Sequence, residues 1–371
     1  MKSEEISDFL SERIAAEDFP SAVYLVAEKG EIRFADALGL AVKTNEIEIP
    51  ARIDTIYDLA SLTKVLVTGL LWAKLYDEMK LRLNTSIKYQ LPEFKVFDKR
   101  LTSTKELLTH TSGFAAWKPF YLLTNDQDEI LSVIAAQPLE SKPNILVRYS
   151  DLNFITLGYF IERVYGKKLL AIVEREILKP LKLKRTFFNP PLKFKNEIAA
   201  SEFGNEYEKQ ICGGLGLEVE NFAWRERQIW GEVHDGNAYF LGGVSGHAGL
   251  FSTAEEVFKI ALQFLPSTTV LFKSKSDVCD LFKTNFTEHL NEARSLAFEL
   301  AATENSTASK ALSPDSFGHL GFTGTSLWIE PERERVFILL TNRTHRPLPF
   351  VNINSTRRKF HELASQLLDK S

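Results

Sequence analysis

Cysteine is scarce in this chain, and charge of neither sign dominates. Only two of the 371 residues are cysteines, Cys212 and Cys279, so the sequence predicts no framework of disulfide bonds. Lysine and arginine together number 45 against 49 for aspartate and glutamate, which gives a formal net charge of −4. Nucleic acids are bound by clustered positive charge. We therefore expect no nucleic-acid partner.

Long hydrophobic runs are also missing. The longest stretch without Asp, Glu, Lys or Arg, residues 236–254, is rich in glycine and serine, whereas a membrane-spanning helix needs about 20 mostly apolar residues. Residues 1–8 read MKSEEISD and lack the apolar core of a secretory signal. We expect no membrane partner and a cytoplasmic location. Apolar residues make up 44% of the chain, enough for a sizeable core.

The order of the expected elements indicates an α+β fold, an α/β sandwich. Helical spacing of apolar residues is clearest at residues 4–17, 62–76 and 356–369. Runs typical of strands occur near both ends of the chain, at residues 22–27, 32–38, 317–321, 326–330 and 336–340. We therefore predict an antiparallel sheet built from both termini and flanked by helices, with a mostly helical lobe inserted.

The predicted domain organisation follows from this order. We expect one two-lobed catalytic domain over residues 1–371. Its sheet lobe comprises about residues 1–80 and 255–371, and its helical lobe about residues 81–254.

Residues 61–64 (SLTK) form the single Ser-x-x-Lys motif of the chain and precede an apolar run. On a helix, Ser61 and Lys64 lie one turn apart on the same face. Apolar neighbours favour the neutral form of a lysine, and an uncharged amine beside a hydroxyl makes a nucleophile with its own base. The structural alternative is a helix start whose lysine extends to solvent.

Two further segments carry candidate chemistry. Tyr149 and Asp151 precede a strong helical pattern, so Asp151 is a candidate helix N-cap and Tyr149 a candidate cleft phenol. Residues 319–326 (HLGFTGTS) follow an expected strand, and their glycines allow a ligand close to the backbone, whose N–H groups can face an oxyanion. The alternatives are a capped helix and a tight turn between strands.

Histidine is found in two segments of small residues. Residues 107–113 (LLTHTSG) contain His110, and residues 242–249 (GGVSGHAG) contain His247. Each is either catalytic or a structural hydrogen-bonding residue. His234, Asp235 and His247 suggest a metal site, but their spacing matches no established ligand pattern. We expect neither a metal nor an organic cofactor.

Taken together, the motifs resemble those of a known group of enzymes. Ser-x-x-Lys, then Tyr-x-Asp, then His-Leu-Gly near a C-terminal strand resembles the motif order of serine β-lactamases and penicillin-recognising enzymes. The chain is similar to the class C β-lactamase-like serine hydrolase family, which includes esterases and D-amino-acid peptidases. Residues 107–113 and 242–254 are also family-like, and the resemblance spans residues 20–345.

The resemblance implies a role for each motif residue. Ser61 is the acylated nucleophile, Lys64 its partner base, and Tyr149 the proton carrier to the leaving group. The oxyanion hole consists of the main-chain N–H groups of Ser61 and Phe322. The implied substrate-binding residues are Asp151, His319, Gly321 and Thr323.

The sequence departs from the family pattern at three of these positions. Asp151 stands where asparagine is usual, His319 where β-lactamases carry lysine, and Leu320 where they carry threonine. A histidine is mostly neutral near pH 7, and leucine offers no hydrogen-bond donor. We therefore expect weak recognition of carboxylate-bearing β-lactams, unless Arg343 or Arg346 restores positive charge near the cleft.

The expected function is a serine hydrolase that acts by acyl-enzyme transfer on small ester, amide or peptide substrates, of esterase or D-peptidase type. The alternatives are a true β-lactamase, a non-catalytic member that binds peptides or serves as a scaffold, and a metallohydrolase using His234, Asp235 and His247. The sequence leaves the natural substrate and the oligomeric state open.

Overall fold

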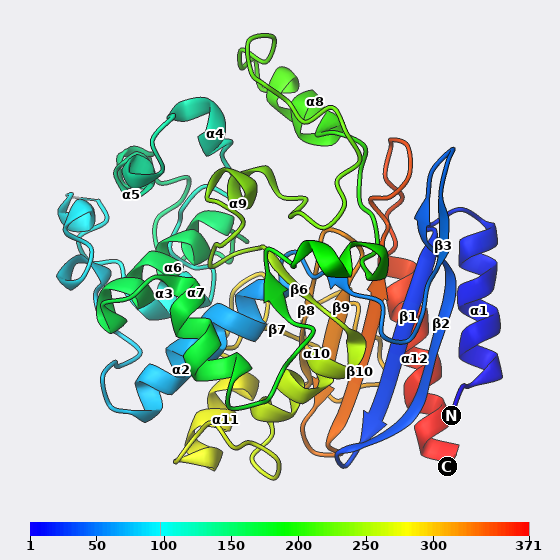
Figure 1. Cartoon of the computed structure of the whole chain (residues 1–371). Coiled ribbons are helices and arrows are strands. Elements are labelled where there is room, and N and C mark those ends of the chain that lie inside the picture. The colour runs from blue at the N-terminus through cyan, green and yellow to red at the C-terminus, as the bar shows by residue number, and fades with distance from the viewer. Residues whose placement is uncertain (97, 371) are drawn as a thin grey trace.

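The main sheet joins the two ends of the chain. The computed structural model describes residues 1–96 and 98–370. Seven strands pair antiparallel in the order β3-β2-β1-β10-β9-β8-β7. Their bounds are β1 Ser21–Glu28, β2 Glu31–Lys43, β3 Glu48–Pro50, β7 Glu299–Leu300, β8 Phe317–Leu320, β9 Ser326–Glu330 and β10 Arg335–Thr341. The predicted sheet from both termini is confirmed, because β1 lies directly beside β10 (Figure 1).

The first hairpin shows how local sequence sets the register of this sheet. Glu28 of β1 pairs with Glu31 of β2, which leaves a two-residue turn of Lys29 and Gly30. Both turn residues have positive φ, 52° and 78°, as the primed turns that suit the right-handed twist of paired strands require. The predicted hairpin is therefore confirmed.

Helices cover both faces of the sheet. Side chains of β1 alternate between two hydrophobic clusters, with Val23 and Leu25 in one and Tyr24 and Val26 in the other. The second cluster lies under α1 (Glu4–Ala15) and α12 (Asn354–Lys370), which contact each other. On the other face, α10 (Ala254–Ala261) contacts β1 and β10. β1 is buried on both faces, which accounts for its continuous apolar sequence.

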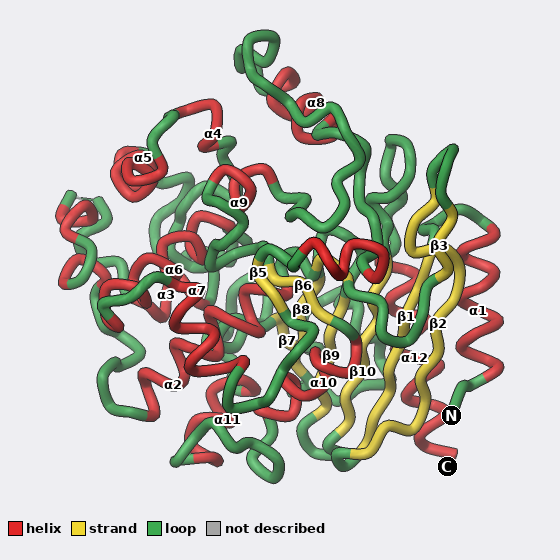
Figure 2. Tube along the Cα trace, viewed as in Figure 1, coloured by secondary structure: helices red, strands yellow, loops and turns green. Residues whose placement is uncertain are grey.

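In the middle of the chain the regular elements are mainly helices, joined by long loops (Figure 2). The α-helices of this region, with α2 before it and α11 after it, are α2 Leu70–Asp77, α3 Thr104–Leu108, α4 Phe120–Leu123, α5 Ile130–Ala136, α6 Asp151–Tyr165, α7 Leu169–Val173, α8 Glu206–Gly214, α9 Gly236–Phe240 and α11 Lys275–Lys283. A small second sheet, which the sequence did not predict, has the order β4-β6-β5 and consists of β4 Tyr57–Asp58, β5 Phe187–Phe188 and β6 Leu250–Ser252. The proposed boundaries of the two lobes stay a prediction.

Near the motifs, the expected N-cap was wrong, whereas the helix expected over residues 62–76 is confirmed. The N-cap of α6 is Ser150, whose hydroxyl accepts from the Asn153 N–H at 3.4 Å, and Asp151 is the first residue of the helix. A capping hydroxyl one residue earlier leaves the Asp151 carboxylate free to act elsewhere. The helix expected over residues 62–76 contains a fully buried π-helical segment, Lys64–Gly69, before α2. Such segments are rare and often lie at functional sites.

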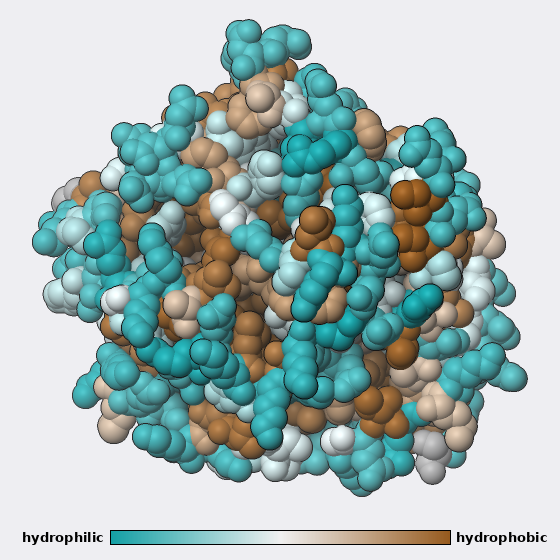
Figure 3. Space-filling model, in the orientation of Figure 1, coloured by the Kyte–Doolittle hydropathy of each residue, from teal (hydrophilic) through white to brown (hydrophobic). Residues whose placement is uncertain are grey.

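The face shown in Figure 3 is mainly hydrophilic, with hydrophobic side chains in its central depressions and in smaller groups elsewhere. Across residues 1–96 and 98–370, no helix combines the length and the apolar character that spanning a membrane requires.

A close backbone contact joins α6 to the loop before β6. A Cβ built on Gly246 would lie 2.9 Å from Gly158 Cα and would also overlap the Phe154 carbonyl oxygen. The Gly246 carbonyl accepts from the Thr68 hydroxyl at 2.6 Å. Only glycines allow this approach, which places the next residue, His247, against the π-helical segment.

We expect Gly246→Ala to lower the free energy of unfolding by about 1–3 kcal/mol, because the added methyl overpacks a site bounded by main-chain atoms. Denaturant unfolding monitored by circular dichroism measures the change. The matched control is Gly213→Ala in α8, where a Cβ meets no atom within 4 Å. That change should be neutral or stabilising, as alanine is the better helix former. Equal effects of the two substitutions would contradict the prediction.

Candidate active site

A cleft of about 670 Å³ opens where the C-terminal end of β8 faces the N-terminal end of α6. Six of the sequence-predicted residues line it: Ser61, Tyr149, Asp151, His319, Gly321 and Phe322. Lys64 lies directly behind Ser61, without exposed surface. Thr323 lies beside the cleft, because its hydroxyl donates to the Asp58 carbonyl at 2.7 Å. The structure thus brings residues of all three motifs together.

Lys64 is fully engaged by protein groups. Its Nζ lies 2.8 Å from the Ser61 hydroxyl oxygen, 3.0 Å from the His247 carbonyl oxygen and 2.7 Å from Asp151 Oδ1. An ammonium group has three N–H donors and no acceptor. These contacts, together with that to the Tyr149 phenol, leave no N–H group free and fix the side chain against the Ser61 oxygen.

The expectation that Lys64 is uncharged was wrong. Burial is the largest single influence and lowers the pKa of Lys64, but Asp151 and Tyr149 together outweigh it, so this pKa lies above its ordinary value. The apolar run after the motif supplies the burial, and the carboxylate comes from α6, about ninety residues further along the chain. The resting site therefore holds an ammonium–carboxylate pair beside Ser61.

Tyr149 stands between two histidines at the cleft wall. Its ring centroid lies 4.6 Å from that of His110 and 5.8 Å from that of His319, and Lys64 Nζ lies 5.1 Å from it. Its phenol also interacts with Ser61 and Lys64. Burial raises the pKa of Tyr149, and Lys64 opposes that effect only in part. The phenol is therefore protonated at neutral pH.

The main-chain N–H of Phe322 is aimed by an arginine that the sequence did not reveal. Arg357 of α12 donates to the Gly321 carbonyl at 2.7 Å. In a trans peptide the C=O of one residue and the N–H of the next point in opposite directions. Holding the Gly321 carbonyl therefore turns the Phe322 N–H the other way, on the side of the peptide opposite Arg357.

The main-chain N–H of Ser61 is oriented in the same manner. Ala60 has φ of 46°, an uncommon conformation for a residue with a side chain, and its carbonyl accepts from the Thr63 N–H at 3.0 Å and hydroxyl at 2.7 Å. Within residues 1–96 and 98–370, the N–H groups of Ser61 and Phe322 donate to no protein acceptor. Both belong to cleft-lining residues and are available to an oxyanion.

Comparison with known proteins agrees with this geometry. The Beta-lactamase family model matches residues 6–359. The chain belongs to the β-lactamase family. Membership makes it a serine hydrolase, as the sequence predicted.

Two curated relatives of this β-lactamase-family protein carry the same name. It is 32% identical over 356 residues to a protein of Escherichia coli (strain K12) named "Putative D-alanyl-D-alanine carboxypeptidase", covering 89% of this chain and 80% of that one. The equivalent protein of Salmonella enteritidis PT4 (strain P125109) is 32% identical over 368 residues, 91% of this chain and 82% of that one.

Solved structures share the fold at lower identity. EstCE1, a hydrolase with promiscuous acyltransferase activity, has a TM-score of 0.72 at 19% identity, covering 96% of this chain and 97% of that one. A β-lactamase/D-alanine carboxypeptidase from Pseudomonas syringae has a TM-score of 0.74 at 14% identity, with the same coverage. The predicted α+β fold is thus confirmed.

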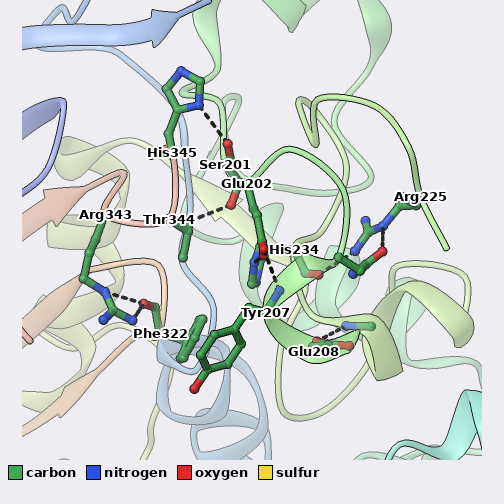
Figure 4. A network of polar contacts seen from close by, with 12 residues as sticks. Ser201, Glu202, Tyr207, Glu208, Arg225, His234, Phe322, Arg343, Thr344 and His345 are labelled. Carbon is green, nitrogen blue, oxygen red and sulfur yellow. Dashed lines mark hydrogen bonds and ion pairs between the residues drawn. The ribbon is translucent and has the colours of Figure 1, made fainter. Parts of the chain in front are cut away.

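A network of side chains supports the Phe322 loop in this β-lactamase-family protein (Figure 4). The Phe322 ring lies 4.9 Å from Tyr207, 5.5 Å from His234 and 4.8 Å from the Arg343 guanidinium. Arg343 also donates to the Phe322 carbonyl at 3.1 Å through Nε. Tyr207 lies on α8, so this helix is tied to the floor of the cleft.

The metal-site alternative included His234, which the structure does not place with the other candidate ligands. His234 Nε2 lies 2.7 Å from Glu202 Oε2, away from Asp235. Among the described residues, Asp151, Asp235 and His247 are the set of possible ligands whose atoms come within 4.8 Å of one another. In this set, Asp151 already forms an ion pair with the Lys64 ammonium. A second cation at the same carboxylate would meet charge repulsion, so the donor set fits a metal poorly.

Several cleft residues were not predicted from the sequence. Arg294 lines the cleft and pairs with Glu292 at 2.7 Å, and its guanidinium lies 5.9 Å from the Tyr149 ring centroid. Of the two suggested arginines, Arg343 lines the cleft, whereas Arg346 pairs with Glu17 at 3.6 Å outside it. No local pattern marks Arg294 or Arg357, because each enters the cleft only through the packing of distant segments.

Proposed function

We propose that this chain hydrolyses small ester or amide substrates through an acyl-enzyme on Ser61, as an esterase or a D-amino-acid peptidase. The observation that carries the proposal is the 2.8 Å contact between Lys64 Nζ and the Ser61 oxygen in a cleft to which two unpaired N–H groups belong. The relatives named for carboxypeptidase activity and the EstCE1 fold support the substrate class.

In the proposed mechanism, the Ser61 oxygen attacks the carbonyl carbon as its proton passes to the Tyr149 oxygen. Tyr149 in turn gives its own proton to the leaving group, so the phenol ends the step protonated. The Lys64 cation stabilises negative charge on the serine and phenol oxygens throughout. The N–H groups of Ser61 and Phe322 bind the oxyanion, and such a donor is typically worth ~3 kcal/mol. Water then repeats the sequence in reverse and releases the acid.

A true β-lactamase is the second candidate, and the third motif argues against it. Burial, reinforced by the positive charges of Lys64 and Arg294, holds the pKa of His319 well below its ordinary value. His319 is therefore neutral and supplies no permanent cation to a substrate carboxylate. Leu320 adds no donor. Penicillins should acylate Ser61 slowly if at all.

The test is intact-mass spectrometry after incubation with a panel of esters, D-amino-acid amides, penicillins and a fluorophosphonate. A Ser61-dependent acyl adduct with an ester or amide supports the proposal, and its mass identifies the acyl group. A lasting adduct confined to penicillins would favour the penicillin-binding alternative. A protein that takes up no label yet binds cell-wall peptides would be a non-catalytic member.

Removal of metal ions should leave the activity unchanged. Lys64 already pairs with Asp151, a carboxylate that a divalent cation would need in the candidate ligand set. We expect p-nitrophenyl acetate hydrolysis to keep its rate after dialysis against EDTA and 1,10-phenanthroline. A loss of activity that zinc or manganese restores would support the metallohydrolase instead. The expectations of a cytoplasmic location and of small-molecule partners stay predictions.

A further inference from the structure

One wall of the cleft presents three carboxylates from three different helices. Asp151 is the first residue of α6, Glu208 lies on α8 and Asp235 caps α9, and all three line the cleft. Glu208 is buried and accepts from the Tyr121 hydroxyl at 2.6 Å and the Gly236 N–H at 2.8 Å. Carboxylates only accept hydrogen bonds when ionised, so this wall receives donors.

Lys64, the cation next to this wall, has no free N–H group for a ligand. The three N–H groups of Lys64 are shared among the Ser61 and Tyr149 hydroxyls, the Asp151 carboxylate and the His247 carbonyl. Asp151 uses Oδ1 for that ion pair, and no described residue donates to its Oδ2. The Asp151 carboxylate thus lies within two hydrogen-bond lengths of the Ser61 oxygen and keeps one oxygen free at the cleft.

His319 adds a second unused acceptor, by an independent argument. Its Nδ1 lies 2.8 Å from the Leu320 carbonyl oxygen, which can only accept, so Nδ1 carries the proton of the neutral ring. Nε2 is then an acceptor, and it has no partner among the described residues, although His319 is only 3% exposed and lines the cleft. A buried acceptor left unpaired is costly, so a ligand donor there is favoured.

Asp151 and His319 accept hydrogen bonds at positions where the family pattern has donors. An asparagine amide can donate to a substrate carbonyl, and a lysine donates to a substrate carboxylate. Asp151 and His319 can do neither, since each offers a lone pair. An acyl group bearing a carbonyl on this side, as in an N-acylated amino acid, would place oxygen against oxygen at Asp151.

We propose that the preferred substrate carries a free, protonated amine on the carbon next to its scissile carbonyl, and that Asp151 is the residue that selects for it. This inference rests on the proposed acyl transfer to Ser61. An α-amine lies two bonds from the carbonyl carbon that Ser61 attacks, which is within reach of the free Asp151 oxygen. Glu208 and Asp235 add further carboxylate acceptors on the same wall. The substrate class is an unblocked amino-acyl ester, amide or short peptide.

The test compares matched substrates within one protein. D-alanine methyl ester, N-acetyl-D-alanine methyl ester and methyl propionate differ in the amine alone, and a pH-stat follows their hydrolysis. We expect kcat/KM for the free amine to exceed that for either analogue by about tenfold or more, as for a hydrogen bond between charged partners. Asp151→Asn should reduce this ratio by about tenfold, and the ratio cancels any shared loss through Lys64.

A second pair of variants separates charge from folding. Glu208→Gln should lower the ratio while the other two carboxylates remain, and Glu206→Gln, an exposed glutamate on the same helix, should leave it unchanged. Equal or higher kcat/KM for the acetylated ester, or turnover of neither amino-acyl ester, overturns the inference. Ser61-dependent hydrolysis of p-nitrophenyl acetate in the same preparation keeps the proposed function standing in either case, and its absence removes both.

Discussion

Replacing Ser61 by alanine should lower kcat/KM for p-nitrophenyl acetate by about 10⁴-fold or more, the scale seen when a catalytic nucleophile is removed. The structure gives the reason: Lys64 and Tyr149 both converge on this oxygen, and among the described residues that line the cleft Ser61 is the only serine or threonine. Initial rates, corrected for spontaneous hydrolysis, measure the loss. The variant should also take up no fluorophosphonate label.

The control is Ser11→Ala, at an exposed position of α1 far from the cleft in sequence and structure. It should retain wild-type rates and labelling. The Ser61→Ala protein should unfold at nearly the wild-type denaturant concentration, since only one partly exposed hydroxyl is lost. Hydrolysis by Ser61→Ala at the wild-type rate would remove Ser61 from the mechanism.

Replacing Lys64 by methionine should impair both folding and activity. The Asp151 carboxylate would lose its partner, and an uncompensated, mostly buried charge costs about 3–5 kcal/mol. Its side chain is 16% exposed, so some solvent screening remains and the lower part of that range is expected. Because Lys64 also stabilises the charge on Ser61 and Tyr149, kcat/KM should fall by about 10³-fold. Urea unfolding and ester hydrolysis measure the two effects.

An exposed ion pair provides the matched control. Lys259 pairs with Glu255 at 2.7 Å, with both side chains largely in solvent, so Lys259→Met should cost less than about 1 kcal/mol. The double variant Lys64→Met/Asp151→Asn should regain much of the lost stability, because the stranded charge is gone, but not the activity. If the double variant were no more stable than Lys64→Met alone, the unpaired carboxylate would not be the cause.

The pH dependence has a definite sign. The pKa of Lys64 is raised above its ordinary value of 10.5 in the folded chain. A lysine whose folded pKa is raised contributes stability that is present below the unfolded pKa and is lost as the pH rises through the folded one. The stability difference between wild type and Lys64→Met should therefore persist through neutral pH and shrink only in strongly alkaline solution.

The sheet and its flanking helices could be predicted because their signals are local. Short continuous apolar runs mark β9 and β10, and the positive-φ turn at Lys29 and Gly30 fixes the first hairpin. The small β4-β6-β5 sheet escaped notice because two- and three-residue strands have too few side chains to show a period. The N-cap of α6 was misplaced by one residue because Ser150 and Asp151 are both good caps.

The residues of the site also divide into those with a local sequence signal and those without one. Ser61, Lys64, Tyr149 and the Gly321 loop belong to motifs with fixed spacing, so they were found from the sequence. Arg294 and Arg357 were not found, because each reaches the cleft through long-range packing and has no neighbouring pattern. The charge of Lys64 was misjudged for a related reason: the apolar run beside it was visible, whereas its partner Asp151 was then assigned to a helix cap.

The sequence alone determined which groups can react, because side-chain chemistry and one-turn spacing are fixed by residue identity and backbone geometry. Tertiary structure decided the protonation and the orientation of these groups. The approach of Asp151 on α6 keeps Lys64 charged, burial keeps His319 neutral, and the contact of Arg357 with the Gly321 carbonyl aims the Phe322 N–H. Protonation and orientation depend on neighbours within a few ångströms, and only the folded chain brings those neighbours together.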